Sequence, residues 1–163
     1  MIDQQTFDRL LPLACEWAKA QVQFILARGM PLDPRHRADA ARVGVRDSSS
    51  VRMLVVDRMP LPENYELAKA ARYTQIITEC CRGVAFGHGI IIRADAWGDR
   101  ELVVHQLVHV AQCERSGGIE PFVQRYLCDR HESEEFSIGA LEAEARRIAQ
   151  EMCGAEAGAD YVR

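Results

Sequence analysis

The sequence predicts an α+β fold in which helices predominate. Three observations lead to this prediction: five segments carry helical apolar spacing or helix-start and helix-stop residues, two segments are rich in β-branched residues, and helices outnumber strands. The length of 163 residues suits a single core, and 48% apolar with 27% charged residues is the balance of an ordinary globular protein. We therefore expect one domain over residues 1–163.

Residues 4–27 form the first predicted helix, because their apolar side chains recur at close to helical spacing. Pro12 either kinks this helix or opens its main part, and the helix ends before Gly29. Residues 31–50 are polar and include prolines and three consecutive serines, a composition that predicts mostly loop with room for one short helix. We expect the main role of the first helix to be packing against the rest of the fold.

Two strand segments flank a capped helix. Residues 51–56, VRMLVV, are apolar and β-branched and predict a strand that the following prolines stop. Asn64 offers a cap for a helix over residues 65–78. Residues 83–94 predict one bent strand or two short ones, because two glycines allow a bulge.

Three helices complete the predicted fold. Residues 100–118, RELVVHQLVHVAQCERSGG, predict a helix that is apolar nearly all round and therefore buried. Pro121 stands where a first helical turn tolerates it, so a helix is predicted over residues 121–131. A polar loop around 132–135 separates it from a last helix over 138–152.

Composition argues against several classes of partner. The formal charge is −4 without a long Lys/Arg stripe, so we expect neither nucleic acid nor an anionic membrane. No run of about eighteen apolar residues predicts a membrane span, and no secretory signal is recognisable. The six scattered cysteines lack a C-x-x-C pair, which favours reduced thiols and a cytoplasmic protein. Action as a monomer and assembly with a second copy stay equally open.

His105 and His109 are candidate metal ligands. Residues four apart lie on one face of a helix, so the two imidazoles can direct nitrogen atoms at one point. Zinc accepts neutral imidazole at about 2.0 to 2.1 Å and takes three protein ligands in catalytic sites. A third ligand must then come from another element. The competing interpretation is that each histidine hydrogen-bonds a backbone carbonyl in the core.

The segment HQLVH, residues 105–109, resembles the H-E-x-x-H motif of the zincin metallopeptidases. LEAEARRIA, residues 141–149, is similar to the downstream motif of the gluzincin branch, in which a glutamate on a second helix is the third zinc ligand. The resemblance implies a compact gluzincin (minigluzincin) core over 51–153, with a small sheet before the zinc helix. Residues 1–50, the N-terminal helix and loop, lie outside this core, and 154–163 form a tail. Zinc is the implied cofactor, and a peptide or protein the implied substrate.

Two glutamates compete for the third ligand position. Leu141, Ala145 and the apolar residues one and two turns later form the buried stripe of the predicted last helix. Glu144 lies on one shoulder of this stripe, and Glu142 lies farther round the other. The E-x-E-A pattern of the family also favours the second glutamate. We expect His105, His109 and Glu144 to hold the metal, with Glu142 as second choice, against the alternative that both glutamates are solvated helix charges.

Gln106 stands where the family has its catalytic glutamate. In the implied mechanism that glutamate takes a proton from zinc-bound water and passes it to the leaving amine. Glutamine has no basic oxygen, and losing a general base costs about 10²- to 10⁴-fold in rate. We therefore expect zinc binding to persist and peptide hydrolysis to be absent or strongly impaired. Two interpretations stay open: an experimental substitution of a natural glutamate, and a natural pseudoenzyme or metal-stabilised binding domain.

Tyr126 and His131 are candidates for stabilising a developing oxyanion, because both carry hydrogen-bond donors and follow the predicted zinc helix. The strand around His88 precedes that helix, as the substrate-pairing edge strand does in zincins. The resemblance therefore implies that an extended peptide pairs with this strand through backbone hydrogen bonds. His88 itself is expected to be structural or exposed rather than a ligand.

Overall fold

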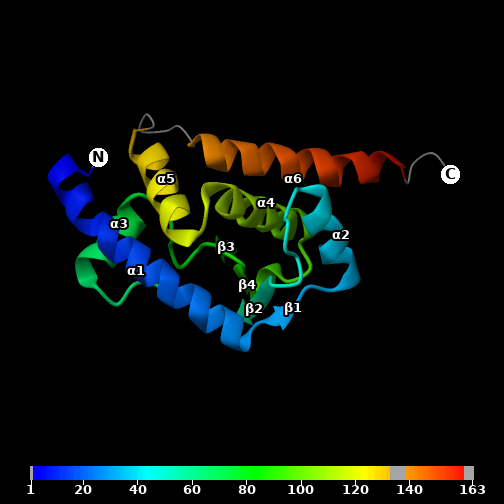
Figure 1. Ribbon diagram of the computed structural model, residues 1–163, viewed down its shortest axis with the longest axis horizontal. Coiled ribbons are helices and arrows are strands. Elements are labelled where there is room, and N and C mark those ends of the chain that lie inside the picture. Colours follow the sequence, from blue (N-terminus) through cyan, green and yellow to red (C-terminus); the bar gives the residue numbers. More distant parts are fainter. Residues whose placement is uncertain (1, 133–138, 160–163) are drawn as a thin grey trace.

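The computed structural model describes residues 2–132 and 139–159 and has the helix-dominated α+β architecture that the sequence predicts. In chain order the elements are α1 (Gln4–Arg28), β1 (Met30–Pro31), α2 (Pro34–Arg42), β2 (Arg52–Val56), α3 (Tyr65–Tyr73), β3 (Gly83–Phe86), β4 (Gly89–Arg93), the short 3-10 helix η1 (Ala94–Ala96), α4 (Arg100–Ser116), α5 (Ile119–Glu132) and α6 (Ala140–Ala159). The small sheet lies at the centre, α1 runs diagonally across it, and α6 lies along α4 (Figure 1).

The four strands form one sheet in the order β1-β2-β4-β3. β2 and β4 are parallel, with Met53 opposite Ile90, and the crossover between them contains α3. The segment predicted over 83–94 is two short antiparallel strands, β3 and β4, joined by a tight turn that contains His88. β4, which leads toward the histidine helix, is therefore an interior strand. Of these two strands only β3 lies at an edge of the sheet, where the implied pairing with a peptide would take place.

The alternating side chains of β4 join the sheet to helices on its two faces. Ile90 and Ile92 lie in one buried cluster with Val104 and other residues of α4. Ile91, which points to the opposite face, lies in a second cluster with Ile25 of α1. The three isoleucines are almost completely buried, and full burial of each contributes about 1.5 to 3 kcal/mol. This packing fixes α4 and α1 on opposite sides of the sheet.

Two N-terminal predictions need correction. α1 begins at Gln4 and contains Pro12, so the proline does not open the helix. The helix predicted over 65–78 ends at Tyr73, because Gln75 adopts a left-handed backbone with φ 55°. The residues after this turn pack under α1, where Ile77 is buried. The early end of α3 thus places residues 74–77 beside the sheet.

The C-terminal helices run longer than predicted. α5 begins two residues before Pro121, so the proline still sits in the first turn. α6 continues to Ala159, where the pattern predicts an end near residue 152. Most of the loop predicted at 132–135, and the last four residues of the tail predicted over 154–163, lie outside the described residues.

The start of α4 is held by a cap and by an ion pair with a buried carboxylate. The Asp99 side chain accepts a hydrogen bond from the Leu102 amide at 3.1 Å. Asp39 of α2 is 2% exposed and lies 2.7 Å from the Arg100 guanidinium. At the other end, Gly117 stops the helix with φ 89°, a conformation that favours glycine. The helix that carries the histidines is therefore fixed at both termini.

Glu114 joins the last turn of α4 to the sheet. Its carboxylate accepts hydrogen bonds from the amides of Arg46 and Asp47 at 2.7 and 3.1 Å, and it lies 2.8 Å from His88 Nε2. Burial opposes ionisation of Glu114, but these hydrogen bonds hold the pKa of its carboxyl below the usual value. His88 therefore makes a structural contact.

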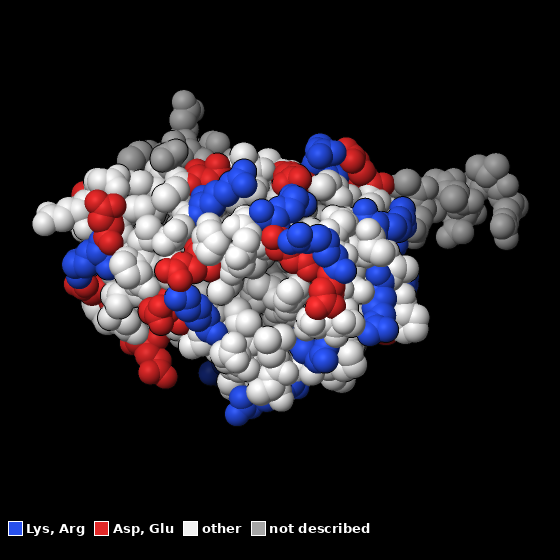
Figure 2. Space-filling view, viewed as in Figure 1, with Lys and Arg blue, Asp and Glu red and all other residues white. Residues whose placement is uncertain are grey.

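Lysine and arginine side chains are interspersed with acidic ones on the face that Figure 2 shows, without a broad patch of either sign. In the part of the chain that the structure describes, no helix has both the length and the apolar character needed to cross a bilayer.

Candidate metal centre

α4 and α6 bring two histidines and one glutamate together. His105 and His109 lie one turn apart on α4, and Glu142 lies in the first turn of α6. The two imidazole Nε2 atoms are 3.1 Å apart. Glu142 Oε1 is 3.2 Å from His105 Nε2, and Oε2 is 3.2 Å from His109 Nε2. Each imidazole thus turns its Nε2 atom toward the carboxylate, and each carboxylate oxygen faces one of the two rings.

These separations fit a single zinc ion. An ion bound tetrahedrally at about 2.0 to 2.1 Å holds its ligand atoms about 3.3 Å apart. The Nε2–Nε2 distance of 3.1 Å and the two imidazole–carboxylate distances of 3.2 Å, each to a different oxygen of Glu142, are close to this value. Among the described residues, this is the one group of three or more histidine, cysteine or acidic side chains with spacing suited to a metal ion. Two imidazoles and one carboxylate are also a ligand set that zinc uses in hydrolytic sites.

The structure corrects the choice between the two glutamates. Glu142, the second choice, contacts the histidines, whereas the carboxylate of Glu144 accepts a hydrogen bond from Gln112 at 2.8 Å and pairs with Arg115 at 3.2 Å. A helical wheel shows in which direction a side chain points around the axis of its own helix. It does not show which turn of a neighbouring helix that side chain contacts. Here Glu144 contacts Gln112 and Arg115, which follow His109 in α4.

Gln112 is a site residue that the sequence reasoning missed. Its side chain is 1% exposed, and its Nε2 donates to the Leu141 carbonyl at 2.9 Å and to Glu144 at 2.8 Å. The Oε1 atom lies 2.8 Å from His109 Nδ1. Because Oε1 can only accept, Nδ1 carries a proton toward it, and Nε2 is the ring nitrogen that faces Glu142, where it can bind a metal ion whenever it carries no proton. A glutamine in a run of buried α4 residues, three after a histidine, is the signal that could have identified it.

Burial and hydrogen bonds together determine the ionisation of Glu142 and Tyr126. Burial opposes ionisation of Glu142, but hydrogen bonds from His105 and His109 outweigh this effect and hold the pKa of the carboxyl well below its usual range. The Tyr126 hydroxyl donates to Glu142 Oε2 at 3.1 Å. Burial, together with the nearby Glu142 charge, raises the pKa of Tyr126 well above its usual value. Tyr126 therefore stays a neutral hydrogen-bond donor beside a carboxylate.

The two candidates for oxyanion stabilisation lie in different places. The Tyr126 ring meets the His109 ring edge-on, with centroids 5.8 Å apart. His131 instead stacks on Phe7 of α1, with centroids 4.3 Å apart and the rings 13° from parallel. The structure thus brings Tyr126 to the histidine–glutamate group, whereas His131 packs against Phe7 of α1, which contacts α5.

Gln106 faces the same cavity as the ligand group. It is 4% exposed and lies between the two histidines in the sequence of α4. A methyl group at Gly83, the first residue of β3, would lie 3.4 Å from its Nε2 atom. The amide therefore sits between α4 and the edge strand. A neutral amide there can donate and accept hydrogen bonds but cannot take up a proton near neutral pH.

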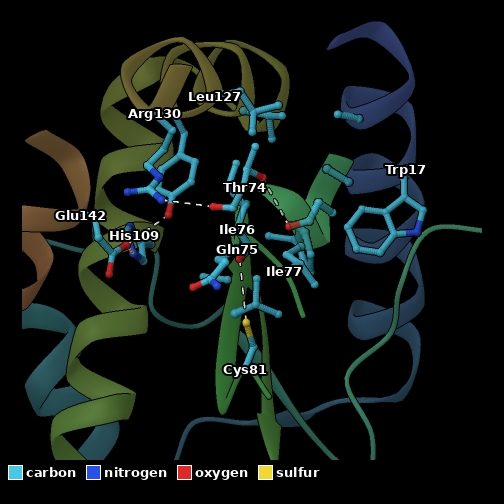
Figure 3. Close-up of a pocket in the computed structure, with 18 of the residues that line it drawn as sticks. Trp17, Thr74, Gln75, Ile76, Ile77, Cys81, His109, Leu127, Arg130 and Glu142 are labelled. Atoms are coloured by element: carbon cyan, nitrogen blue, oxygen red, sulfur yellow. Dashed lines mark hydrogen bonds and ion pairs between the residues drawn. The ribbon is translucent and has the colours of Figure 1, made fainter. Parts of the chain in front are cut away.

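A cavity of about 410 Å³ extends from the ligand group (Figure 3). His105, His109 and Glu142 form part of its wall, so the group is accessible from one side. Comparison of the chain with protein-family models, with curated proteins and with solved structures finds no match in any of the three.

Proposed function

We propose that the chain is a zinc-binding, metallopeptidase-like hydrolase whose catalysis is strongly impaired by Gln106. The observation that carries this proposal is the convergence of His105, His109 and Glu142 at the edge of a cavity, where one ligand atom from each residue lies within 4.8 Å of the others. Zinc bound there would polarise a water molecule and the carbonyl of a peptide.

Three side chains of the protein would act around the bound ion. Gln112 holds the His109 ring with Nε2 toward the ligand group. Tyr126 keeps its proton and donates it in a hydrogen bond to Glu142, so it would hydrogen-bond an oxyanion only by giving up this contact. Gln106 can orient a water molecule but cannot accept its proton, which lowers the expected rate by about 10²- to 10⁴-fold.

A second function is a metal-stabilised binding domain, either a natural pseudoenzyme or a module that never cleaves. The observation that favours it is the contact between the first turn of α6 and the middle of α4, which an ion would reinforce. Metal binding to the folded chain adds directly to its stability, so such a site is useful without catalysis.

Metal analysis tests the zinc site. Purified protein should contain one zinc per chain by plasma mass spectrometry. His105→Ala and Glu142→Gln should lose the metal, and Glu144→Gln, the matched control on the same helix, should keep it. Protein that remains folded yet binds no zinc at micromolar concentration would refute the proposal.

Restoring the acidic side chain separates the two functions. Gln106→Glu should leave zinc content unchanged and raise hydrolysis of a mixed peptide library by about 10²-fold or more. The added activity should disappear in the double variant Gln106→Glu with Glu142→Gln. A zinc-loaded Gln106→Glu protein without hydrolysis would favour the binding domain.

A further inference from the structure

The cavity beside the histidine–glutamate group bends around the free edge of the sheet. All four residues of β3 line it, as do side chains from α4 on one face of the sheet and from α1 on the other. Because the sheet separates these two helices, a space that touches both must run around the edge strand. Figure 3 shows Trp17 of α1 at one side of this space and His109 with Glu142 at the other, with residues 74–77 between them. A molecule that fills the cavity must therefore be long and able to bend.

The part of the wall that α1, α3 and β3 form is apolar. Leu11 and Ala14 of α1 and Ala70 of α3 belong to it, and the Trp17 ring meets the Phe86 ring of β3 edge-on, with centroids 5.3 Å apart. Among the described residues that line the cavity, these three elements contribute no charged side chain. This part of the wall can therefore bury apolar ligand surface without removing a charge from water.

Two cations lie at the opposite end of the cavity. Arg146, which is exposed, lines it one turn after Glu142 on α6, and residues four apart share one face of a helix. Arg130 of α5 also lines it and donates to the Thr74 carbonyl at 3.3 Å. Glu142 is the one acidic side chain among the described residues of the wall, so two guanidinium groups face one carboxylate. This end therefore favours an anionic group over a neutral or cationic one.

We propose that the cavity binds one unbranched aliphatic chain with an anionic head group, as in a long-chain carboxylate. The head group lies near Arg130 and Arg146, and the chain follows the bend past β3 toward α1. A flexible chain fits such a bend better than a rigid ring system, because each of its carbon–carbon bonds can rotate between staggered conformations. The cavity volume of about 410 Å³ lies within the usual range of roughly 300 to 1,000 Å³ for sites that enclose a small molecule. The inference goes beyond the proposed zinc site and does not depend on a bound ion.

The dependence of affinity on chain length tests the inference. Binding of octanoate, decanoate, dodecanoate and hexadecanoate to metal-free protein would be measured by calorimetry, below the concentrations at which these compounds form micelles. Burial of one methylene group tightens binding about three- to four-fold. The affinity should therefore rise about tenfold or more for every two carbons, and it should stop rising once the chain fills the cavity. One ligand should bind to each protein chain.

Compounds with the same chain and different head groups test the charge. Dodecanoate should bind more tightly than dodecanol, and dodecyltrimethylammonium should bind most weakly. Arg146→Gln should weaken dodecanoate binding about two- to five-fold, as expected for one exposed charge pair, and leave dodecanol binding unchanged. Arg147→Gln is the matched control, because Arg147 is not part of the wall and pairs with Glu151 at 2.9 Å.

Variants that narrow the apolar part of the cavity locate the chain. Ala14→Phe, on α1, should end the gain in affinity at a shorter chain and leave octanoate binding unchanged. Leu13→Phe is the matched control, because Leu13 is 40% exposed and is not part of the wall. Ala70→Leu narrows the cavity from α3 and replaces Ala14→Phe should the latter fail to fold, as judged by circular dichroism.

Several results would overturn the inference. They are the absence of saturable binding by folded protein up to about 1 mM dodecanoate, an affinity that does not change with chain length, and equal binding of dodecanoate and dodecyltrimethylammonium. Dodecanoate binding that is unchanged in folded Ala14→Phe and Ala70→Leu proteins also overturns it. Tighter binding of anthracene-2-carboxylate than of dodecanoate would assign the cavity to a rigid ring system instead.

The same measurements keep the inference separate from the proposed function. Because the binding experiments use metal-free protein, any of the results above would leave the proposed zinc site standing. Protein that contains no zinc, yet binds long-chain carboxylates with the expected dependence on chain length and charge, would refute the proposed function and support the inference.

Discussion

Gln112→Ala removes the side chain that joins His109 to the start of α6. The Leu141 carbonyl loses its buried donor and His109 Nδ1 loses its acceptor. An unsatisfied buried polar group costs about 1 to 3 kcal/mol, so the free energy of unfolding of the metal-free protein should fall by at least that amount. Removing a hydrogen bond that orients a metal-binding histidine typically weakens metal affinity about 10- to 100-fold, and we expect the same loss here.

Two companion variants separate orientation of His109 from packing. Gln112→Glu keeps an acceptor for His109 but cannot donate to Leu141 when ionised, and it faces Glu144. This variant should therefore lose stability and retain zinc affinity. Arg115→Ala breaks only the exposed pair with Glu144, which contributes about 0 to 1 kcal/mol, and should leave zinc affinity unchanged.

Urea unfolding of the metal-free variants measures stability, and competition with a fluorescent chelator measures zinc affinity. Of the three variants, only Gln112→Ala should bind zinc more weakly than the parent chain. A destabilised Gln112→Ala protein that binds zinc as tightly as the parent chain would refute the role of Gln112 in orienting His109.

Three further predictions concern charged side chains. Glu142→Gln should weaken zinc binding far more than Glu144→Gln in chelator competition, because only the former faces the imidazoles. Glu114→Gln should lower stability at neutral pH, and the difference from the parent should shrink as the pH falls from about 6 to about 3, because a carboxyl with a lowered folded pKa stabilises only while ionised. A difference independent of pH in urea unfolding would contradict this. Asp39→Ala removes a buried carboxylate that pairs with the partly buried Arg100 and should cost about 3 to 5 kcal/mol of unfolding free energy. A loss below about 1 kcal/mol would contradict the prediction.

The helices and the histidine pair were predictable because their signals are local. Asp99 and Gly117 mark the ends of α4 in the sequence, and the apolar run between them indicates burial. The spacing of His105 and His109 places them on one helix face whatever surrounds the helix. The end of α3 was not predictable, because residues 65–78 keep a helical pattern and the turn at Gln75 is accompanied by burial of Ile77 under α1.

The glutamate and its supporting residues depended on how α6 crosses α4. Glu142 and Glu144 are two positions apart, and both lie beside the buried stripe of one helix. The choice between them depends on which turn of α4 each carboxylate meets, and this is a property of the pair of helices. Gln112 was missed for the same reason, since its partners Leu141 and Glu144 lie about thirty residues away in the chain.

The sequence by itself determined that the chain folds as a helix-rich α+β domain and that two imidazoles share one face of a buried helix, because capping, apolar periodicity and the helical repeat act over a few neighbouring residues. Only the tertiary structure decided that Glu142 completes the group, that Tyr126 joins it while His131 stacks on Phe7, and that a cavity follows the edge of β3. Those features arise from contacts between distant segments, and the side chains that make them pack only after α1, α5 and α6 take their places around α4 and the sheet.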